Sequence, residues 1–466
     1  MNDKPQKIHF IGIGGSAMAP IAIALKQHGY GITGSDTNVY PPVSTLLSEN
    51  GISFFQGYAA QNLVSNPDLV VVGNAISRGN SELEEMLNRR VPYCSLPELV
   101  KNFFLQGKRP IVVTGTHGKT TVSSLLAWVL ECGGKNPSFL IGGIPLNFGV
   151  GARFTDSEWL VIEGDEYDTA FFDKRSKFLH YLPQLVVVNN LEFDHADIFA
   201  NLEAIQLSFT NLMKLIPERG RVFINGDDPN ILNPLKQARC PVVKYGLGAG
   251  NDLTATVSSL TPAMTTFLLN GVQFEINLAG EFNVRNAMAV IACARECGVN
   301  DDQIQEAFYS FKSAKRRMEV FGQVSGVTIV DDFAHHPTAI KETIKGMRSR
   351  YPGRRLWVAF EPRTNTTRRS VFQKELAEAL AGADLVTLGA VARSNQLAAT
   401  ERLDVTVLME QISSAGKAAY QFDTASEIAT HYSQRKLPND VFCIMTNGAF
   451  DGLGAKLVDA LQKTPD

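Results

Sequence analysis

The chain has 466 residues, too many for one hydrophobic core, so roughly two to four domains are expected. Hydrophobic residues make up 44% and charged residues 20%, the proportions of an ordinary globular protein. The formal net charge of −3 and the lack of a long basic run argue against nucleic acid or an anionic membrane as the main partner.

The N-terminus leads directly into an apolar strand and shows no signal-peptide pattern. No run of about 18 apolar residues occurs, so no membrane span is predicted. Of the six cysteines, only Cys293 and Cys297 are close, and their four-residue spacing fits one face of a helix. We interpret the cysteines as buried or idle thiols rather than a metal site or disulfides. A cytoplasmic protein without an obligatory protein partner is expected.

Residues 1–107 alternate strands with helices, which predicts a parallel, doubly wound sheet. Strands are expected at 7–13, up to Asp36 and at 69–72, with an apolar helix at 18–27. The glycine-rich turn at 12–17 and the acid at 36 match the dinucleotide fingerprint G-x-G-x-x-A. Any diphosphate attached to a ribose satisfies the same physics, UDP included. The predicted ligands are Gly12, Gly14, Gly15, Ser16, Asp36, Asn74 and Ser77.

Residues 108–318 open with a strand at 109–114, a glycine-bearing turn and a helix that runs through 130. This order predicts a phosphate cradle in which Lys119 neutralises the terminal phosphates of a nucleotide and Thr120 ligates Mg²⁺. The general P-loop pattern has a glycine where this chain has Val113, so a chance Gly-Lys-Thr in a surface turn is the alternative. The predicted ATP ligands here are Gly115, Thr116, His117, Gly118, Lys119, Thr120 and Thr121.

Two further strands of this segment end in candidate metal ligands. Glu163 follows the strand at 159–162, and His195 lies in a polar stretch after the strand at 185–188. Because parallel strands end at one crevice, Glu163 is expected to bind Mg²⁺ with Thr120, and His195 to ligate a second Mg²⁺. A structural hydrogen bond is the alternative for His195. A solvated loop is expected for one or two of Asp165, Glu166 and Asp168.

The end of this segment adds amides and cations. Short strands at 265–269 and 273–278 precede a helix at 283–297. Asn283 and Asn286 lie one turn apart on that helix, where they can read an adenine edge, and N-capping is the alternative for Asn283. Arg316 and Arg317 follow, and either can reach a transferring phosphoryl group. A solvated charge run is the alternative for these cations.

Residues 319–466 form a third segment, with strands expected at 327–330, 356–360, 385–388 and 441–445. The first of these strands ends in Asp331 and Asp332, followed by His335 and His336. Such a density of titratable groups at a strand end indicates a functional site, with core packing as the alternative for one histidine.

These motifs, in this order, resemble the Mur ligase family, the ATP-dependent amide ligases of peptidoglycan synthesis. The motifs are GTHGKTT (115–121), EGDEYD (163–168), NNLEFDHAD (189–197), EFNVRNA (281–287), KRRMEVFG (315–322) and DDFAHHPT (331–338). The resemblance covers essentially the whole chain. It implies an α/β protein with a Rossmann-like UDP-binding domain (1–107), a central P-loop ATPase-type domain (108–318) and a Rossmann-like C-terminal domain (319–466).

Four segments are similar to the branch of the family that joins the recycled tripeptide L-Ala-γ-D-Glu-meso-diaminopimelate to UDP-N-acetylmuramate. They are IGGIPLNFGVGAR (141–153), DEYDTAFFDKRSKF (165–178), FEPRTNT (360–366) and TNGAFDGL (446–453). The branch that adds free L-alanine usually has a histidine in place of Arg363 and a Gly-Ala-Gly-Asp type ending in place of 447–450. The L-alanine ligase is the nearest alternative, and an NAD(P)-dependent oxidoreductase built on the first glycine turn is an alternative of another class.

The resemblance implies a mechanism with ATP and Mg²⁺. The lactyl carboxylate of UDP-N-acetylmuramate attacks the γ-phosphate of ATP, and the peptide amine then attacks the acyl phosphate as phosphate leaves. The implied catalytic residues are Lys119, His195, Arg317 and His335. Further implied ATP ligands are Asn286, Arg316, Asp331 and Asp332. Arg363, Asn365 and Asn447 are candidate peptide ligands because they follow strands of the third segment.

Overall fold

The computed structural model describes residues 6–37, 39, 43–393 and 397–463, and their contacts divide the chain into two compact units. Unit 1 comprises Met1–Glu192, Glu203–Thr254 and Met288–Lys312. Unit 2 comprises Phe193–Leu202, Ala255–Ala287 and Ser313–Asp466. Unit 1 combines the first predicted domain with most of the predicted central domain, and three stretches of the central domain, Phe193–Leu202, Ala255–Ala287 and residues 313–318, fall in unit 2.

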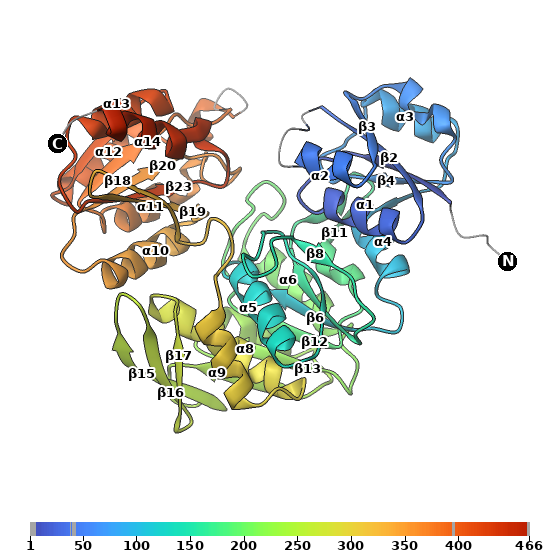
Figure 1. The fold of residues 1–466 in the computed structure, drawn as a ribbon, viewed down its shortest axis with the longest axis horizontal. Helices are drawn as coiled ribbons and strands as arrows, with labels where there is room; N and C mark the ends of the chain where they lie inside the picture. Colours follow the sequence, from blue (N-terminus) through green and yellow to red (C-terminus); the bar gives the residue numbers. More distant parts are fainter. Residues whose placement is uncertain (1–5, 38, 40–42, 394–396, 464–466) are drawn as a thin grey trace. The chain divides into compact units, whose positions relative to one another are not determined.

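The first sheet of unit 1 has five parallel strands in the order β3-β2-β1-β4-β5 (Figure 1). The strands are β1 Lys7–Ile11, β2 Gly31–Asp36, β3 Ser53–Gln56, β4 Leu69–Val72 and β5 Tyr93–Ser95. The helices between them are α1 Met18–Gln27, α2 Val43–Glu49, η1 Ala60–Ser65, α3 Ser81–Asn88 and α4 Leu96–Phe103. The parallel sheet is confirmed, but the strand predicted at 7–13 ends at Ile11. There the N–H groups of Gly12 and Ile13 turn to the carbonyl of Ser35.

The second sheet has ten strands, and its part in unit 1 has the order β14-β13-β12-β6-β9-β7-β8, parallel except for the β7–β8 pair. Its strands are β6 Arg109–Thr114, β7 Ser138–Leu140, β8 Ala152–Arg153, β9 Trp159–Gly164, β12 Leu185–Val188, β13 Arg221–Asn225 and β14 Val242–Gly246. Thr114, the last residue of β6, pairs with Val188 of β12 and Gly164 of β9. The C-terminal ends of these three strands are therefore in register.

The other elements of this part of the chain connect or cover the second sheet. A two-stranded hairpin is formed by β10 Asp168–Ala170 and β11 Asp173–Ser176. The helices are α5 Lys119–Cys132, η2 Lys177–His180, α6 Leu202–Met213, η3 Pro229–Ile231, α7 Leu232–Leu235, α8 Glu281–Glu296 and α9 Asp301–Ser310. Helix α8 begins in unit 2 and ends in unit 1.

Unit 2 contains the antiparallel part of the ten-stranded sheet and a separate mixed sheet. The antiparallel part consists of β15 Leu253–Leu260, β16 Thr265–Leu269 and β17 Val272–Ile276, and β15 starts in unit 1, where it pairs in parallel with β14. The mixed sheet has the order β18-β19-β23-β20-β21-β22, and only β18 is antiparallel to its neighbour. Its strands are β18 Glu319–Val324, β19 Val327–Asp332, β20 Leu356–Phe360, β21 Leu385–Leu388, β22 Ala418–Gln421 and β23 Val441–Met445.

Both faces of the mixed sheet are buried. Val358 and Phe360 of β20 join one apolar cluster, whereas Trp357 and Ala359 join another. The helices are α10 Pro337–Arg350, η4 Ser370–Phe372, α11 Gln373–Leu380, η6 Ala399–Glu401, α12 Val405–Ser414, α13 Ala425–Ser433, η7 Phe450–Gly452 and α14 Leu453–Lys463. This arrangement confirms a doubly wound C-terminal fold. Strand β19 runs to Asp332, so Asp331 and Asp332 are strand residues rather than part of the following loop.

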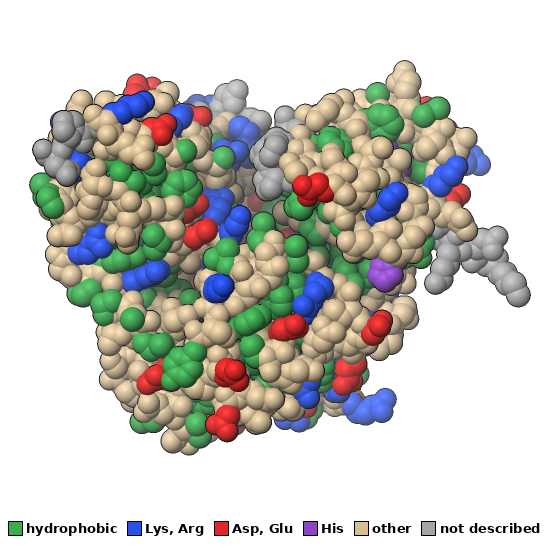
Figure 2. Space-filling view, viewed as in Figure 1, with side chains coloured by type: hydrophobic (Ala, Val, Ile, Leu, Met, Phe, Trp, Pro, Cys, Tyr) green, Lys and Arg blue, Asp and Glu red, His purple; other side chains and the backbone are tan. Residues whose placement is uncertain are grey.

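Three features bear on the function classes considered from the sequence. All six cysteines are free thiols, as predicted. Within the described residues no helix has both the length and the apolar character that a membrane span requires. On the face shown in Figure 2, acidic and basic side chains are interspersed with apolar ones.

Candidate active site

The turn between β6 and α5 has the backbone geometry of a phosphate cradle. Gly115 has φ +130° and Gly118 φ +82°, conformations that side chains rarely adopt. A Cβ added to Gly115 would lie 2.8 Å from the Asn190 carbonyl oxygen and 3.1 Å from the Asn189 nitrogen. Only glycine fits at this position, because the segment after β12 packs directly against the turn.

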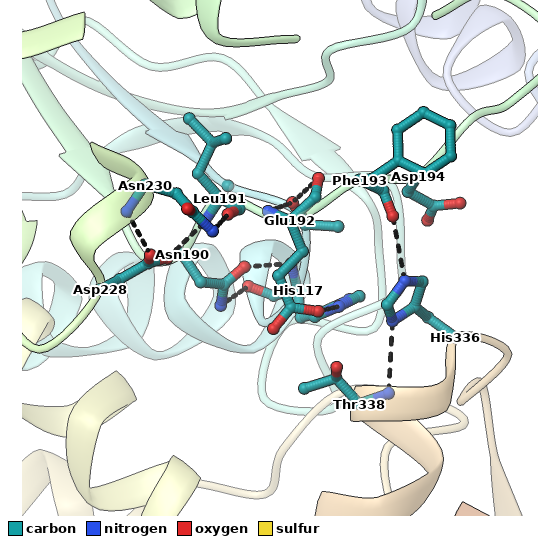
Figure 3. Close-up of polar contacts among 12 residues, drawn as sticks. His117, Asn190, Leu191, Glu192, Phe193, Asp194, Asp228, Asn230, His336 and Thr338 are labelled. Carbon is teal, nitrogen blue, oxygen red and sulfur yellow. Dashed lines mark hydrogen bonds and ion pairs between the residues drawn. The ribbon is translucent and has the colours of Figure 1, made fainter. Parts of the chain in front are cut away.

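That segment also holds the cradle by hydrogen bonds (Figure 3). The His117 N–H donates to Asn190 Oδ1 at 2.7 Å, and Asn190 Nδ2 donates to the His117 carbonyl at 3.0 Å. The Glu192 N–H donates to Thr116 Oγ1 at 2.8 Å. Asn190 was not among the predicted site residues, although two asparagines directly after a buried strand were a visible signal. Its amide fixes the phosphate loop from the neighbouring strand.

Lys119 lies inside this cradle and is bound by oxygen atoms. Its Nζ donates to the Gly115 carbonyl at 2.7 Å and contacts both carboxylate oxygens of Glu166 at 2.9 and 3.1 Å. Burial opposes the charge of Lys119, but Glu166, followed by Asp165, outweighs it and raises the pKa of the ammonium group. Lys119 is therefore a protonated side chain that hydrogen bonds fix within the phosphate turn.

One or two of the three acids after Glu163 were expected in a solvated loop, and of these three Asp165 has the exposed side chain, at 38%. Glu166 is 2% exposed and paired with Lys119, and Asp168 is 8% exposed and paired with Lys174 at 2.6 Å. In the same hairpin Asp173 accepts from Arg175, which lowers the pKa of that carboxyl to about 2. The cations that follow the acids in sequence compensate them, and this fixes the hairpin.

Thr120 and Glu163, predicted as Mg²⁺ ligands, lie side by side. Thr120 Oγ1 donates to Glu163 Oε1 at 2.9 Å, and the Gly142 N–H donates to Glu163 Oε2 at 2.8 Å. A Cβ on Gly143 would lie 2.7 Å from the Thr120 methyl group, so this loop approaches the pair closely. A hydroxyl and a carboxylate are hard oxygen donors of the type Mg²⁺ prefers, so the residues present fit the ion.

The predicted diphosphate site of the first sheet brings its glycines and its acid together. The Gly14 N–H donates to Asp36 Oδ2 at 2.9 Å, and Tyr58 OH donates to Asp36 Oδ1 at 3.3 Å. Burial and the Asp36 charge raise the pKa of Tyr58 to about 12. The other predicted ligands lie around the turn that follows β1 or the one that follows β4; Ser16 and Ser77 are exposed, and Gly15 and Asn74 are half-buried.

Unit 2 holds the predicted residues of the third segment around the end of β19. Arg316 Nε donates to Asp331 Oδ2 at 3.2 Å, and its Nη2 donates to the Thr446 carbonyl at 2.5 Å. The other oxygen of Asp331 is buried and has no hydrogen-bond partner among the described residues, and burial raises the pKa of this carboxyl. Asp331 therefore has an acceptor to offer a ligand.

Asp332 has a different environment, although it was predicted as an ATP ligand with Asp331. Its carboxylate accepts from the N–H groups of Met318 and Ala334, both at 2.8 Å, and from Thr343 at 3.2 Å. Burial raises the pKa of Asp332. These bonds favour a structural role, so Asp331 is the better candidate ligand of the two.

The two histidines also differ. His335 is half-buried, and its Nδ1 lies 2.9 Å from the Phe333 carbonyl oxygen. His336 is 4% exposed and caps α10, where its Nδ1 accepts from the Thr338 N–H. The alternative of core packing, predicted for one of the two histidines, therefore applies to His336. Arg317 lies with its guanidinium carbon 4.8 Å from the centre of the Phe333 ring.

Asn283 and Asn286, predicted to contact an adenine edge, are hydrogen-bonded to each other. Asn286 Nδ2 donates to Asn283 Oδ1 at 3.0 Å, and both side chains are buried. The N-capping alternative for Asn283 was wrong, because α8 begins at Glu281 and Asn283 is inside its first turn.

The predicted peptide residues gather where β20 and β23 end, since these neighbouring strands pair up to Phe360 and Met445. Arg363 is paired with Glu361 at 3.3 Å, and Asn447 Oδ1 is buried without a hydrogen-bond partner among the described residues. Asn365 points elsewhere: it donates to Asp197 at 2.7 Å and accepts from Arg368. His195 belongs to the same unit, in Phe193–Leu202, whereas Lys119 and Glu163 belong to unit 1.

Comparison with known proteins accounts for most of the chain. Residues 7–107 match the family model "Mur ligase family, catalytic domain", 113–294 the "Mur ligase middle domain", and 316–448 the "Mur ligase, glutamate ligase domain". The UDP-N-acetylmuramate–L-alanyl-γ-D-glutamyl-meso-2,6-diaminoheptandioate ligase of Escherichia coli is 39% identical over 98% of both chains. A crystal structure of a murein peptide ligase from Psychrobacter arcticus is 34% identical, with a TM-score of 0.74 over 99% of this chain and 100% of that one. The UDP-N-acetylmuramate–L-alanine ligase of Nitratidesulfovibrio vulgaris is 36% identical over 80% of this chain and 81% of its own.

Proposed function

The chain belongs to the Mur ligase family, and from that premise we propose that it joins UDP-N-acetylmuramate to the tripeptide L-Ala-γ-D-Glu-meso-diaminopimelate. Members of this family are ADP-forming amide ligases. The observation that carries the substrate is identity over the full length: the relative named for the tripeptide is 39% identical over 98% of both chains, whereas the L-alanine ligase of Desulfitobacterium hafniense is 30% identical over 97% of this chain. Between these two full-length relatives, identity favours the tripeptide as the substrate.

The reaction that we propose has two steps. A lactyl carboxylate oxygen attacks the γ-phosphorus of ATP, the bond to the β,γ-bridging oxygen breaks, and ADP leaves with that electron pair. The free amine of the peptide then attacks the acyl carbon, inorganic phosphate leaves, and the ammonium proton passes to a base or to water. Phosphorylation is needed because a carboxylate is a poor acylating agent at neutral pH. The protein's contribution is then charge neutralisation and positioning.

Lys119 is proposed to neutralise the phosphoryl oxygens. Its ammonium group lies in the turn whose N–H groups and helix N-terminus can bind an anion. Glu166 keeps Lys119 protonated and oriented, since the carboxylate raises the pKa of that ammonium group. Thr120 and Glu163 would hold Mg²⁺. The ion, when bound, supplies positive charge beside the phosphates.

Unit 2 is proposed to supply the remaining groups. We propose that Asp331 binds the ribose with its buried oxygen and that Arg316, which pairs with Asp331, binds a phosphoryl oxygen. Arg317 is proposed to assist Arg316, and His335 to contact the reacting carboxylate or amine. Asn286 is proposed for the adenine edge.

The substrate ends are proposed to bind at opposite ends of the chain. The glycine turn and Asp36 would bind the UDP moiety, because the Gly14 N–H lies beside the Asp36 carboxylate and an acid after such a turn suits a ribose. Arg363 and Asn447 would bind the peptide. We also propose the cytoplasm as the location, because it supplies ATP and the UDP-linked sugar.

A substrate comparison tests the proposal. ADP release and amide formation would be measured with ATP and UDP-N-acetylmuramate, adding either the tripeptide or L-alanine. We expect turnover with the tripeptide and little with L-alanine. Turnover with L-alanine equal to or above that with the tripeptide would overturn the proposed substrate. If no ADP is released with either acceptor, the proposed ligase activity is wrong.

A further inference from the structure

The segment Phe193–Leu202 belongs to unit 2, although the residues before and after it, to Glu192 and from Glu203, belong to unit 1. The segment carries His195. In sequence it lies inside the central domain, but its contacts are with the C-terminal part of the chain. Three side chains of unit 2 hold the segment by hydrogen bonds: Thr366, Asn365 and His336.

The most buried of these hydrogen bonds joins Thr366 to Asp194. Thr366 Oγ1 donates to Asp194 Oδ1 at 2.8 Å, and the two residues are 2% and 3% exposed. The same hydroxyl oxygen lies 3.4 Å from the Ala196 nitrogen, which donates to it. Thr366 therefore contacts the residues on both sides of His195.

Two further hydrogen bonds hold the segment on either side of this contact. Asn365 Nδ2 donates to Asp197 Oδ2 at 2.7 Å, at a more exposed position. His336 Nε2 donates to the Phe193 carbonyl at 3.1 Å, as Figure 3 shows. The tautomer is consistent, because the His336 Nδ1 accepts from the Thr338 N–H.

His195 itself has an unfavourable backbone conformation. Its φ is +54°, in the left-handed region that non-glycine residues rarely adopt. The conformation is held from both sides: the His195 N–H donates to Asp194 Oδ1 at 2.7 Å, and its carbonyl accepts from the Ile198 and Phe199 N–H groups at 2.9 and 3.0 Å. Strain of this kind persists only where the surroundings enforce it, and it occurs preferentially at functional sites.

We propose that Thr366 is a positioning residue for His195. Through Asp194 its hydroxyl fixes the strained backbone of His195, so that the unit that holds the candidate peptide residues also carries this proposed Mg²⁺ ligand. The proposal rests on the proposed function, because it takes His195 to be a metal ligand of the ligation reaction.

The chain just before this segment is bonded to the other unit. Glu192 donates to Thr116 in the phosphate turn, whereas the next residue, Phe193, accepts from His336. Consecutive residues are thus fixed to different units.

The full-length enzyme offers a matched pair of variants. Thr366→Val removes the hydroxyl but keeps the shape of the side chain. Thr367→Val is the control: Thr367 is 1% exposed, and its hydroxyl bonds only within its own loop, to Thr364 at 2.8 and 3.2 Å. Hydrogen exchange of peptides that cover 193–202 is the structural readout. We expect faster exchange there in Thr366→Val and unchanged exchange in Thr367→Val.

The Mg²⁺ dependence of ligation is the functional readout. In Thr366→Val the half-saturating Mg²⁺ concentration should rise about tenfold, the scale on which partners of metal ligands act. The KM for UDP-N-acetylmuramate should stay unchanged, and Thr366→Ser should restore the wild-type Mg²⁺ dependence. A merely structural role would lower stability without this change and would not be restored selectively by serine.

If Thr366→Val does not fold, Asp197→Ala removes the more exposed hydrogen bond, the one from Asn365. This variant should also show faster exchange at 193–202 and a higher half-saturating Mg²⁺ concentration, both to a smaller extent. Unchanged exchange and unchanged Mg²⁺ dependence in whichever variant folds would overturn the inference. Absence of ATP-dependent ligation in the wild-type enzyme would instead overturn the proposed function, so the two failures are distinguishable.

Discussion

The ammonium group of Lys119 lies 2.9 and 3.1 Å from the two carboxylate oxygens of Glu166. Both side chains are largely buried, at 14% and 3% exposure. A buried ion pair contributes little net stability, but removal of one partner leaves an uncompensated charge at a large cost. Glu166, in the loop after β9, therefore keeps the lysine of the phosphate turn charged and in place.

This pair gives a prediction that separates folding from catalysis. Lys119→Met should lower the free energy of unfolding by about 3 kcal/mol or more, because Glu166 is left buried without its partner. It should also lower kcat at least about 100-fold, since a cation beside the transferring phosphoryl group is lost. Thermal unfolding and ADP release measure the two effects.

The double variant Lys119→Met with Glu166→Gln is the control. It should recover most of the stability, because the unpaired charge is gone, but none of the activity. Recovery of activity in the double variant would contradict the role proposed for Lys119.

Asn190 gives a second prediction. Asn190→Ala removes the two hydrogen bonds to the His117 backbone, and a looser phosphate turn should raise the KM for ATP about tenfold, with little change in the KM for UDP-N-acetylmuramate. Initial-rate kinetics with each substrate varied in turn measure this split. Asn233→Ala, at an exposed position of α7, should leave both constants unchanged. An equal rise of both constants in Asn190→Ala would point to general loosening instead.

Much of the fold was predictable, because parallel strands buried on both faces are continuous apolar runs. The strands at 109–114, 185–188, 356–360 and 441–445 have the predicted bounds. The hairpin β10–β11 was not predicted. Its strands are rich in charged residues that pair with each other, as Asp168 does with Lys174, so they show no hydrophobic period.

The candidate site was predictable only where a ligand group follows its strand in sequence. Thr120 and Glu163 meet because β6 and β9 are neighbours in register, which the order of the motifs indicated. The contact of Asp194 with Thr366 joins residues 172 positions apart, and no local pattern indicates it. No local pattern indicates the contact of Asn365 with Asp197 either. The sequence therefore could not show that the amide of Asn365 is bound to Asp197.

A third prediction concerns the peptide end. Arg363→Ala should raise the KM for the tripeptide about tenfold or more, because a guanidinium that can bind a carboxylate is lost, and should leave the KM for ATP unchanged. Gly448→Ala should act in the same direction, since a Cβ there would overlap the Arg363 side chain. Gly322→Ala, where an added Cβ meets no atom closer than 3.8 Å, is the control and should leave the KM for the tripeptide at the wild-type value. A wild-type KM for the tripeptide in both test variants would exclude Arg363 as a peptide ligand.

The last prediction concerns acid stability and the hairpin β10–β11. Arg175 lowers the pKa of Asp173 from 3.8 to about 2, so the folded state favours the ionised carboxylate. The stabilisation is fully present above the unfolded-state pKa and is lost as the pH falls from about 4 towards 2. Arg175 is 63% exposed, and solvent screening therefore reduces the contribution to about 1 kcal/mol. Asp173→Asn should lower the unfolding temperature by the same amount at pH 7 and pH 5, and the difference from wild type should shrink below about pH 4. The exposed Asp156→Asn should show no such difference, and a constant deficit of Asp173→Asn down to pH 3 would mean that lost packing, rather than lost charge, is responsible.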